Sequence, residues 1–119
     1  MASTRNLDRR FRPYANILML ALRQVDRRFH INSGFRTRAE QEQLYSKFLR
    51  AQDQGLHPYT TLPPGKSQHE RGLAIDVGRE GIDPREDDIL AAAGAIWRQY
   101  GFTWGGEDDP VHFGAPFGW

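Results

Sequence analysis

The chain has 119 residues, of which 39% are hydrophobic, and it carries 16 Lys and Arg against 15 Asp and Glu. That length fits one domain with one hydrophobic core, and the composition is ordinary for a soluble globular protein. The chain contains no cysteine, which excludes disulfide frameworks, thiolate metal ligands and cysteine nucleophiles.

Charge is divided unevenly along the chain. Residues 1–50 carry 11 basic and 4 acidic side chains, whereas residues 51–119 carry 5 basic and 11 acidic ones. Such a division can mark a surface for a polyanion. The electric fields of the two halves largely cancel if the halves fold together, and we expect no nucleic-acid partner.

The longest apolar run, residues 17–22, is too short for a transmembrane helix or a signal peptide. We therefore expect no stable membrane insertion and no secretion signal.

The first half of the chain predicts two helices and a strand. A helix begins at Pro13, a good first helical residue, and its apolar positions recur at helical spacing: Tyr14, Ile17, Leu18, Ala21, Leu22 and Val25. Residues 29–33 then read as a short strand. Thr37 and Glu40 form a capping-box pattern that starts a second helix, which carries Leu44, Tyr45, Phe48 and Leu49. Residues 54–68 form a long loop rich in Pro and Gly, and such length favours a functional role.

The second half predicts a strand, a helix and a hairpin. Residues 74–77 form a short strand, and Asp83 with Pro84 opens a third helix that Gly101 ends. The apolar stripe of this helix comprises Ile89, Leu90, Ala93, Ile96, Trp97 and Tyr100. Residues 102–104 and 111–113 are two strands joined by residues 105–110, which indicates a hairpin. The order predicts an α+β domain with helices packed on a small, mostly antiparallel sheet.

Two short segments combine His with Asp. His69 lies in a turn before the strand that carries Asp76, and His112 follows Asp109 by three positions. Alternation along the strand places Asp76 on one face and Ile75 and Val77 on the other. If the apolar pair packs into the core, Asp76 points into a cleft. Two His and one Asp can form a three-ligand zinc site with an open fourth position, the pattern of catalytic zinc.

The order of these residues resembles the M15 family of zinc peptidases, the D-Ala-D-Ala carboxypeptidase group. The resemblance rests on Ser67-x-His69-x-x-Gly72-x-Ala74-x-Asp76 followed by Asp109-x-x-His112. Two flanking segments also look like the family's motifs: Ser33-Gly34-Phe35-Arg36-Thr37, with Gln41, Gln43, Leu44 and Tyr45 after it, and Gly101-Phe102-x-Trp104-Gly105-Gly106. Lysostaphin-type peptidases and the hedgehog amino-terminal domain share this family's fold.

The resemblance implies a role for each matching residue. His69, Asp76 and His112 would bind one zinc ion per chain, which lowers the pKa of a water toward about 7. Asp109 would be the general base and then the general acid. Arg36 would stabilise the oxyanion or hold a substrate carboxylate. Ser67 would orient substrate or the ligand loop, and Trp104 would contact substrate at the wall of the cleft.

Asp109 also separates the branches of the family. The carboxypeptidase and dipeptidase branches usually have Glu at this position. An Asp here, in a segment that ends in His-Phe, is more like the L-alanyl-D-glutamate endopeptidases of bacteriophage endolysins. The resemblance thus implies cleavage of the L-Ala–D-Glu bond in the peptidoglycan stem peptide. We expect a monomer with a single domain over residues 1–119, no separate wall-binding domain, and action on the cell wall after release from the host cytoplasm.

Several alternatives stay open at this stage. A D-Ala-D-Ala carboxypeptidase or dipeptidase is the second enzymatic interpretation, and a non-catalytic zinc-binding module is the interpretation outside enzymes. The joint presence of Asp109 and Arg36 favours an enzyme, because a binding module has no chemical need for a base beside the metal. Glu70, Glu107 and Asp108 are weaker candidates for the acid. His30 is expected to be a solvated or hydrogen-bonded residue, and His57 a surface residue.

Overall fold

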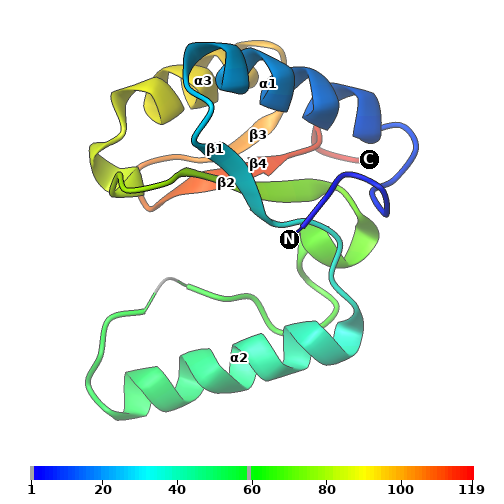
Figure 1. Cartoon of the computed structure of the whole chain (residues 1–119). Coiled ribbons are helices and arrows are strands. Elements are labelled where there is room, and N and C mark those ends of the chain that lie inside the picture. Colours follow the sequence, from blue (N-terminus) through cyan, green and yellow to red (C-terminus); the bar gives the residue numbers. More distant parts are fainter. Residues whose placement is uncertain (1, 59) are drawn as a thin grey trace.

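The computed structural model describes residues 2–58 and 60–119, and Figure 1 shows its layers. Four strands form one antiparallel sheet in the order β1-β2-β4-β3. Their bounds are Phe29–Ser33 for β1, Ala74–Arg79 for β2, Thr103–Gly105 for β3 and Asp109–Gly114 for β4. The predicted α+β class with a small antiparallel sheet is confirmed, and β3 and β4 form the predicted hairpin.

The helices lie on opposite sides of this sheet. Helices α1 (Arg12–Val25) and α3 (Asp88–Gln99) cover one face, and α2 (Arg38–Asp53) lies below the other face (Figure 1). The core fills the space between the sheet and the pair of helices α1 and α3. Its most deeply buried large side chains are Phe11, Phe29, Ile75, Val77, Leu90 and Phe113. The face toward α2 is therefore the one left free for polar side chains.

Local signals set where each helix begins. Pro13 stands in the first turn of α1, and both bonds of the predicted capping box between Thr37 and Glu40 are present at the start of α2. The predicted start of the third helix is wrong. Asp83 caps only a single 3-10 turn, η2 (Pro84–Glu86), and α3 begins at Asp88 after a second cap. That cap is Asp87, whose side chain accepts hydrogen bonds from the backbone amides of Ile89 and Leu90. The backbone of Asp87 is extended, which separates the 3-10 turn from α3.

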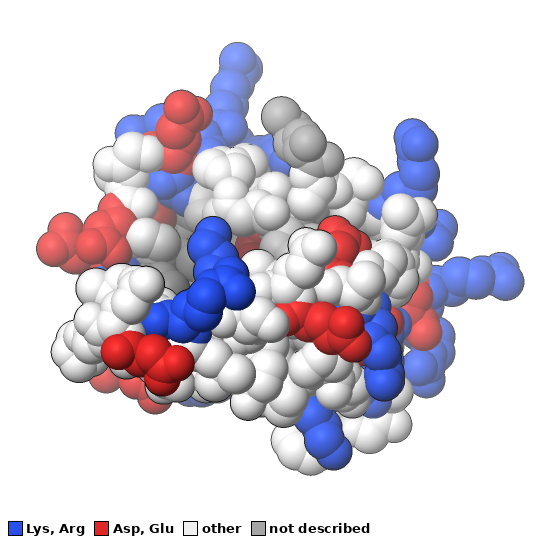
Figure 2. Space-filling view, turned by 90° about the horizontal axis from the view of Figure 1, so that it is seen from below, with Lys and Arg blue, Asp and Glu red and all other residues white. Residues whose placement is uncertain are grey.

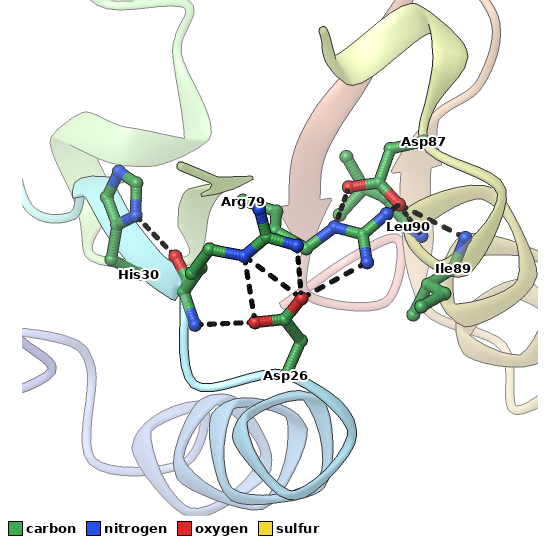
Figure 3. A network of polar contacts seen from close by, with 7 residues as sticks. Asp26, His30, Arg79, Asp87, Ile89 and Leu90 are labelled. Atoms are coloured by element: carbon green, nitrogen blue, oxygen red, sulfur yellow. Dashed lines mark hydrogen bonds and ion pairs between the residues drawn. The ribbon is translucent and has the colours of Figure 1, made fainter. Parts of the chain in front are cut away.

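An ion-pair network joins three elements at one end of the sheet (Figure 3). Arg79 at the end of β2 donates to both oxygens of Asp87, at 3.1 and 3.0 Å, and to Asp26 at 3.4 Å. Asp26 is the C-cap of α1, and it also accepts from Arg28 at 2.8 Å. The hydrogen bonds from Arg28 hold the pKa of Asp26 well below its usual range. This network ties the C-terminus of α1 to the N-terminus of α3 across the sheet.

The buried faces of the helices differ from the predicted stripes. In α1 the buried residues are Ala15, Leu18, Met19 and Leu22, whereas Ile17 and Val25 are both exposed. Ile96 of α3 and Tyr100, its C-cap, are also exposed. Each helix rests on the sheet along one side only, and the apolar residues between α1 and α3 line an open groove. No helix in the described ranges is long and apolar enough to cross a bilayer.

Helix α2 is the least buried of the three helices. Gln41 is its only buried residue, so the predicted apolar positions Leu44 and Leu49 do not join the core. Seen from below, the molecule shows acidic and basic side chains interspersed over this face (Figure 2). The charge division along the sequence therefore does not give this face a single sign.

Candidate metal centre

Strand register brings Asp76 and His112 together. Asp76 of β2 is paired directly with His112 of β4, and neighbours across an antiparallel pair point to the same face. Ile75 and Val77, on either side of Asp76, are fully buried beneath α1 and α3. The predicted alternation is confirmed, because burying these two apolar residues turns Asp76 to the face that α2 overlooks.

A tight turn carries His69 to the same place. The 3-10 turn η1 (Gln68–Arg71) is capped by Ser67, whose hydroxyl accepts from the His69 amide at 3.2 Å. The turn ends at Gly72, which has the left-handed φ of 70°. A Cβ at Gly72 would lie 2.7 Å from the Asp8 amide nitrogen, so both conformation and space require glycine here. The chain then enters β2, which delivers Asp76.

The three predicted ligands form one cluster. His69, Asp76 and His112 each offer one ligand atom, and these atoms lie within 4.8 Å of one another. Nε2 of His69 is 3.2 Å from Oδ1 of Asp76, and Nδ1 of His112 is 3.5 Å from that same oxygen. Two imidazoles and one carboxylate that converge in this way suit zinc with an open coordination position.

Neighbouring groups fix the orientation of His69 and Asp76. The Gly34 carbonyl oxygen lies 2.8 Å from Nδ1 of His69, so this nitrogen donates and Nε2 is free to face the cluster. Oδ2 of Asp76 accepts from Nη2 of Arg36 at 3.0 Å, which leaves Oδ1 toward the imidazoles. Such outer contacts are typical of metal ligands.

The two carboxyl groups of the site have opposite pKa shifts. Burial acts to raise the pKa of Asp76, but the two neighbouring imidazoles, His112 and His69, outweigh it and hold the pKa below its usual range. Burial, followed by the charge of Asp76, raises the pKa of Asp109 at the start of β4. Asp76 is therefore set to remain ionised, while Asp109 is set to exchange a proton more readily than an exposed Asp.

Arg36 is held on three sides within the site. Its Nε donates to the Ser33 hydroxyl at 2.9 Å, and its Nη1 donates to Oε1 of Gln41 at 3.2 Å, in addition to the bond with Asp76. Gln41 is almost fully buried and donates in turn to the Leu62 carbonyl at 2.8 Å. These bonds anchor α2 and the long loop after it to the candidate site.

Ser67 and Trp104 do not line an open cleft. The Ser67 side chain caps the turn of His69 and the residue is only 5% exposed, so it orients the ligand loop. Trp104 pairs with Phe113, and the register turns both to the face opposite His112. There the indole packs on Gly94 of α3 and donates to the Pro110 carbonyl at 2.8 Å. The structure thus does not bring Trp104 to the candidate metal centre, against the expectation that it contacts substrate.

The weaker candidates also lie outside the cluster. Glu70 accepts from the Gly65 amide at 2.8 Å and so anchors the long loop. Glu107 and Asp108 are exposed in the β3–β4 connection, and His57 is exposed in the long loop. His30 meets the Arg28 carbonyl through Nδ1 at 3.0 Å, in the network of Figure 3.

The family model for VanY, described as D-alanyl-D-alanine carboxypeptidase, matches residues 4–106. The chain belongs to this family. That result supports the M15 resemblance seen in the sequence. The matched residues end just before Asp109 and His112, so the match does not include the segment that distinguishes the branches. No curated protein matches the chain.

Solved structures of three peptidases share the fold. A VanY D,D-pentapeptidase variant in complex with Zn(II) has a TM-score of 0.69 at 22% identity, covering 92% of this chain and 72% of that one. The LD-carboxypeptidase LdcB has a TM-score of 0.72 at 21% identity, covering 96% and 68%. The D,D-dipeptidase VanXYg, bound to a D-Ala-D-Ala phosphinate analogue, has a TM-score of 0.66 at 25% identity, covering 92% and 50%. The predicted zinc cofactor agrees with the zinc complex of the first relative and with the ligand cluster of this chain.

Proposed function

We propose that the chain is a zinc peptidase that hydrolyses the L-Ala–D-Glu bond of the peptidoglycan stem peptide. The observation that carries the proposal is the convergence of His69, Asp76 and His112 within 4.8 Å, close to a carboxyl group, Asp109, whose pKa is raised. Membership of a peptidoglycan peptidase family supports the peptidase part of the proposal. The proposal includes a monomeric domain that acts on the cell wall after release from the host cytoplasm.

Zinc would be held by Nε2 of His69, Oδ1 of Asp76 and Nδ1 of His112, the atoms that face one another in the cluster. When bound, zinc polarises a carbonyl group and activates water at neutral pH. The Asp109 carboxylate would accept a proton from the attacking water and release it to the amine nitrogen as the C–N bond breaks. Its raised pKa suits a group that must do both.

Arg36 would serve the reaction from the rim of the cluster. A guanidinium has five N–H donors, and three of them bond to Ser33, Gln41 and Asp76. Within the described residues this leaves up to two donors for an oxygen of the substrate. Because the group is always charged, it can stabilise an oxyanion or pair with a carboxylate of the stem peptide.

The residue at position 109 is the ground for the proposed scissile bond. Asp109 is one methylene shorter than the Glu usual in the carboxypeptidase branch, and it precedes a His-Phe pair as in the endopeptidases. D-Ala-D-Ala carboxypeptidase activity is the second candidate, because that is the description of the matching family, and a VanYB structure was solved with D-alanine-D-alanine.

A digest of purified Gram-negative peptidoglycan, analysed by mass spectrometry, tests the proposal. The digest is run with the intact protein, with a chelator, and with zinc restored after chelation. New peptides that begin at D-Glu, formed only with metal, are the expected result. Loss of one terminal D-Ala would assign the carboxypeptidase activity instead. Absence of any cleavage by folded, zinc-loaded protein would support the non-catalytic zinc-binding module.

A further inference from the structure

Gln68 lies directly behind the candidate ligand His112. We propose that Gln68 is a positioning residue that fixes the ring orientation and the tautomer of His112, so that Nδ1 is free to bind the metal. The inference rests on the proposed zinc site and adds a residue to it. Gln68 occupies an unspecified position of the motif, between Ser67 and His69, so the sequence pattern alone did not single it out.

The bond between the two side chains selects one tautomer. Nε2 of His112 lies 2.9 Å from Oε1 of Gln68. An amide oxygen only accepts hydrogen bonds, so Nε2 must carry the proton. A neutral imidazole then has its free lone pair on Nδ1, and this is the nitrogen that faces Oδ1 of Asp76 at 3.5 Å. The opposite tautomer would place a proton on the metal-facing nitrogen.

The amide of Gln68 is itself held in one orientation. Its Nε2 lies 3.4 Å from the Ala115 carbonyl as a donor. The Thr103 hydroxyl lies 3.3 Å from Oε1 of Gln68 and 3.0 Å from the Ala115 carbonyl, and its single proton can serve only one of these acceptors at a time. If the amide were turned over, its oxygen would face the Ala115 carbonyl oxygen and its NH2 group would face Nε2 of His112. The first change is unfavourable in either tautomer of His112, because two carbonyl oxygens would face each other with no donor between them. The surroundings therefore keep the acceptor pointed at His112.

Glycine at position 114 makes room for this arrangement. A Cβ built on Gly114 would overlap both Oε1 of Gln68 and Oγ1 of Thr103. Gly114 pairs with Ala74 and with Thr103, which places it on the same face of the sheet as Asp76 and His112. The end of β4 thus has a space that the Gln68 amide fills.

Gln68 completes a set of outer contacts around the cluster. His69 has the Gly34 carbonyl behind it at 2.8 Å, and Asp76 has Arg36 behind it at 3.0 Å. For His112 the corresponding contact is the Gln68 amide. Because a backbone carbonyl cannot be altered by substitution, His112 is the imidazole of the pair whose outer contact a single variant can remove.

Zinc affinity measured by competition with a chromophoric chelator tests the proposal. Gln68→Met keeps the length of the side chain but removes its acceptor, and we expect zinc affinity to fall by about 10- to 100-fold. Gln68→Glu restores an acceptor and should recover most of the loss. Gln99→Met, on the exposed side of α3, is the matched control and should bind zinc as the unchanged protein does. Equal affinities for Gln68→Met and the unchanged protein would overturn the proposal.

The tautomer itself gives a second readout that needs no metal and no variant. Histidine ¹⁵N NMR of the metal-free protein, recorded at a pH at which the His112 ring is neutral, should show its one ring proton on Nε2, whereas a single proton on Nδ1 would overturn the proposal. These measurements also separate the two inferences. If the unchanged protein fails to bind zinc, the proposed function is rejected, while the position of the His112 proton still decides the role of Gln68.

Discussion

Nη2 of Arg36 donates to Oδ2 of Asp76 at 3.0 Å, although the two residues lie 40 positions apart in the sequence. Both side chains are largely buried, with exposed fractions of 18% and 17%. The bond occupies the carboxylate oxygen that does not face the imidazoles. Arg36 therefore orients a candidate metal ligand, in addition to the role toward substrate that the family resemblance implies.

We expect Arg36→Lys to lower both zinc affinity and turnover. A lysine keeps the charge but cannot direct bonds to Asp76, Ser33 and Gln41 at once, and loss of an outer contact to a metal ligand typically costs about 10- to 100-fold in affinity or activity. Zinc titration and a peptidoglycan digestion rate check this. Arg38→Lys is the control, because Arg38 has an exposed side chain at the start of α2. Unchanged zinc affinity in Arg36→Lys would show that Arg36 is not needed to orient Asp76.

Substitution of either candidate histidine ligand should abolish tight zinc binding, but the two variants should differ in stability. His69 is only 3% exposed, and its ring bonds to the Gly34 carbonyl. His69→Ala therefore leaves a cavity and a buried acceptor without its partner, which costs about 1–3 kcal/mol for the acceptor alone. His112 is more exposed, so His112→Ala should cost less. Urea unfolding of the metal-free proteins measures the difference, and an equal loss in both variants would contradict this prediction.

Asp109→Asn should retain zinc and lose most turnover. The amide cannot accept and release a proton, and the loss of a general base or acid typically lowers the rate by about 10²- to 10⁴-fold. Asp108→Asn, at the exposed neighbouring position, is the control and should retain near-normal turnover. The measurements are zinc titration and the release of new amino termini from peptidoglycan. If Asp109→Asn also loses zinc, then Asp109 is a ligand and the assignment of His69, Asp76 and His112 is incomplete.

Local patterns predicted the parts of the structure that depend on neighbours in the sequence. The alternation of Ile75, Asp76 and Val77 was sufficient to predict which face of β2 is polar. The capping box of Thr37 and Glu40 predicted the start of α2, because both of its hydrogen bonds join residues within one helical turn. The three candidate ligands were found because they follow a family motif in order.

Features that depend on strand register or packing could not be predicted in this way. Trp104 faces α3 because it pairs with Phe113, and no periodicity within a three-residue strand shows that pairing. Helical spacing identified the apolar residues of α3 but not which of them the sheet covers, so Tyr100 was predicted to be buried although it is 78% exposed. The contact between Gln68 and His112 joins residues 44 positions apart and leaves no local signal.

The packing of Trp104 gives a prediction about stability. A Cβ at Gly94 would overlap the indole ring, so Gly94→Ala should force the ring or the helix to shift. Overpacking of this kind costs about 1–3 kcal/mol. Zinc affinity should be retained, because Trp104 lies on the opposite face from His112. Thermal unfolding and zinc titration check both parts, with Ala95→Ser on the exposed side of α3 as the control.

The ion-pair network of Figure 3 makes stability depend on pH. The pKa of Asp26 is lowered by its hydrogen bonds with Arg28 and with Arg79. A carboxyl group whose pKa is lower in the folded state stabilises the fold above the unfolded pKa, about 3.9 for Asp, and this contribution is lost as the pH falls. Asp26→Asn should therefore lower the urea midpoint at pH 7 and have a smaller effect at pH 3.

The control for this effect is Asp53→Asn, because Asp53 is exposed at the end of α2, away from the network. Its urea midpoint should stay close to that of the unchanged protein at both pH values. Protonation of the other carboxyl groups lowers the stability of all three proteins in acid, so the informative quantity is the difference between each variant and the unchanged protein. A difference for Asp26→Asn that stays constant from pH 7 to pH 3 would show that its charge does not stabilise the joint between α1, β2 and α3.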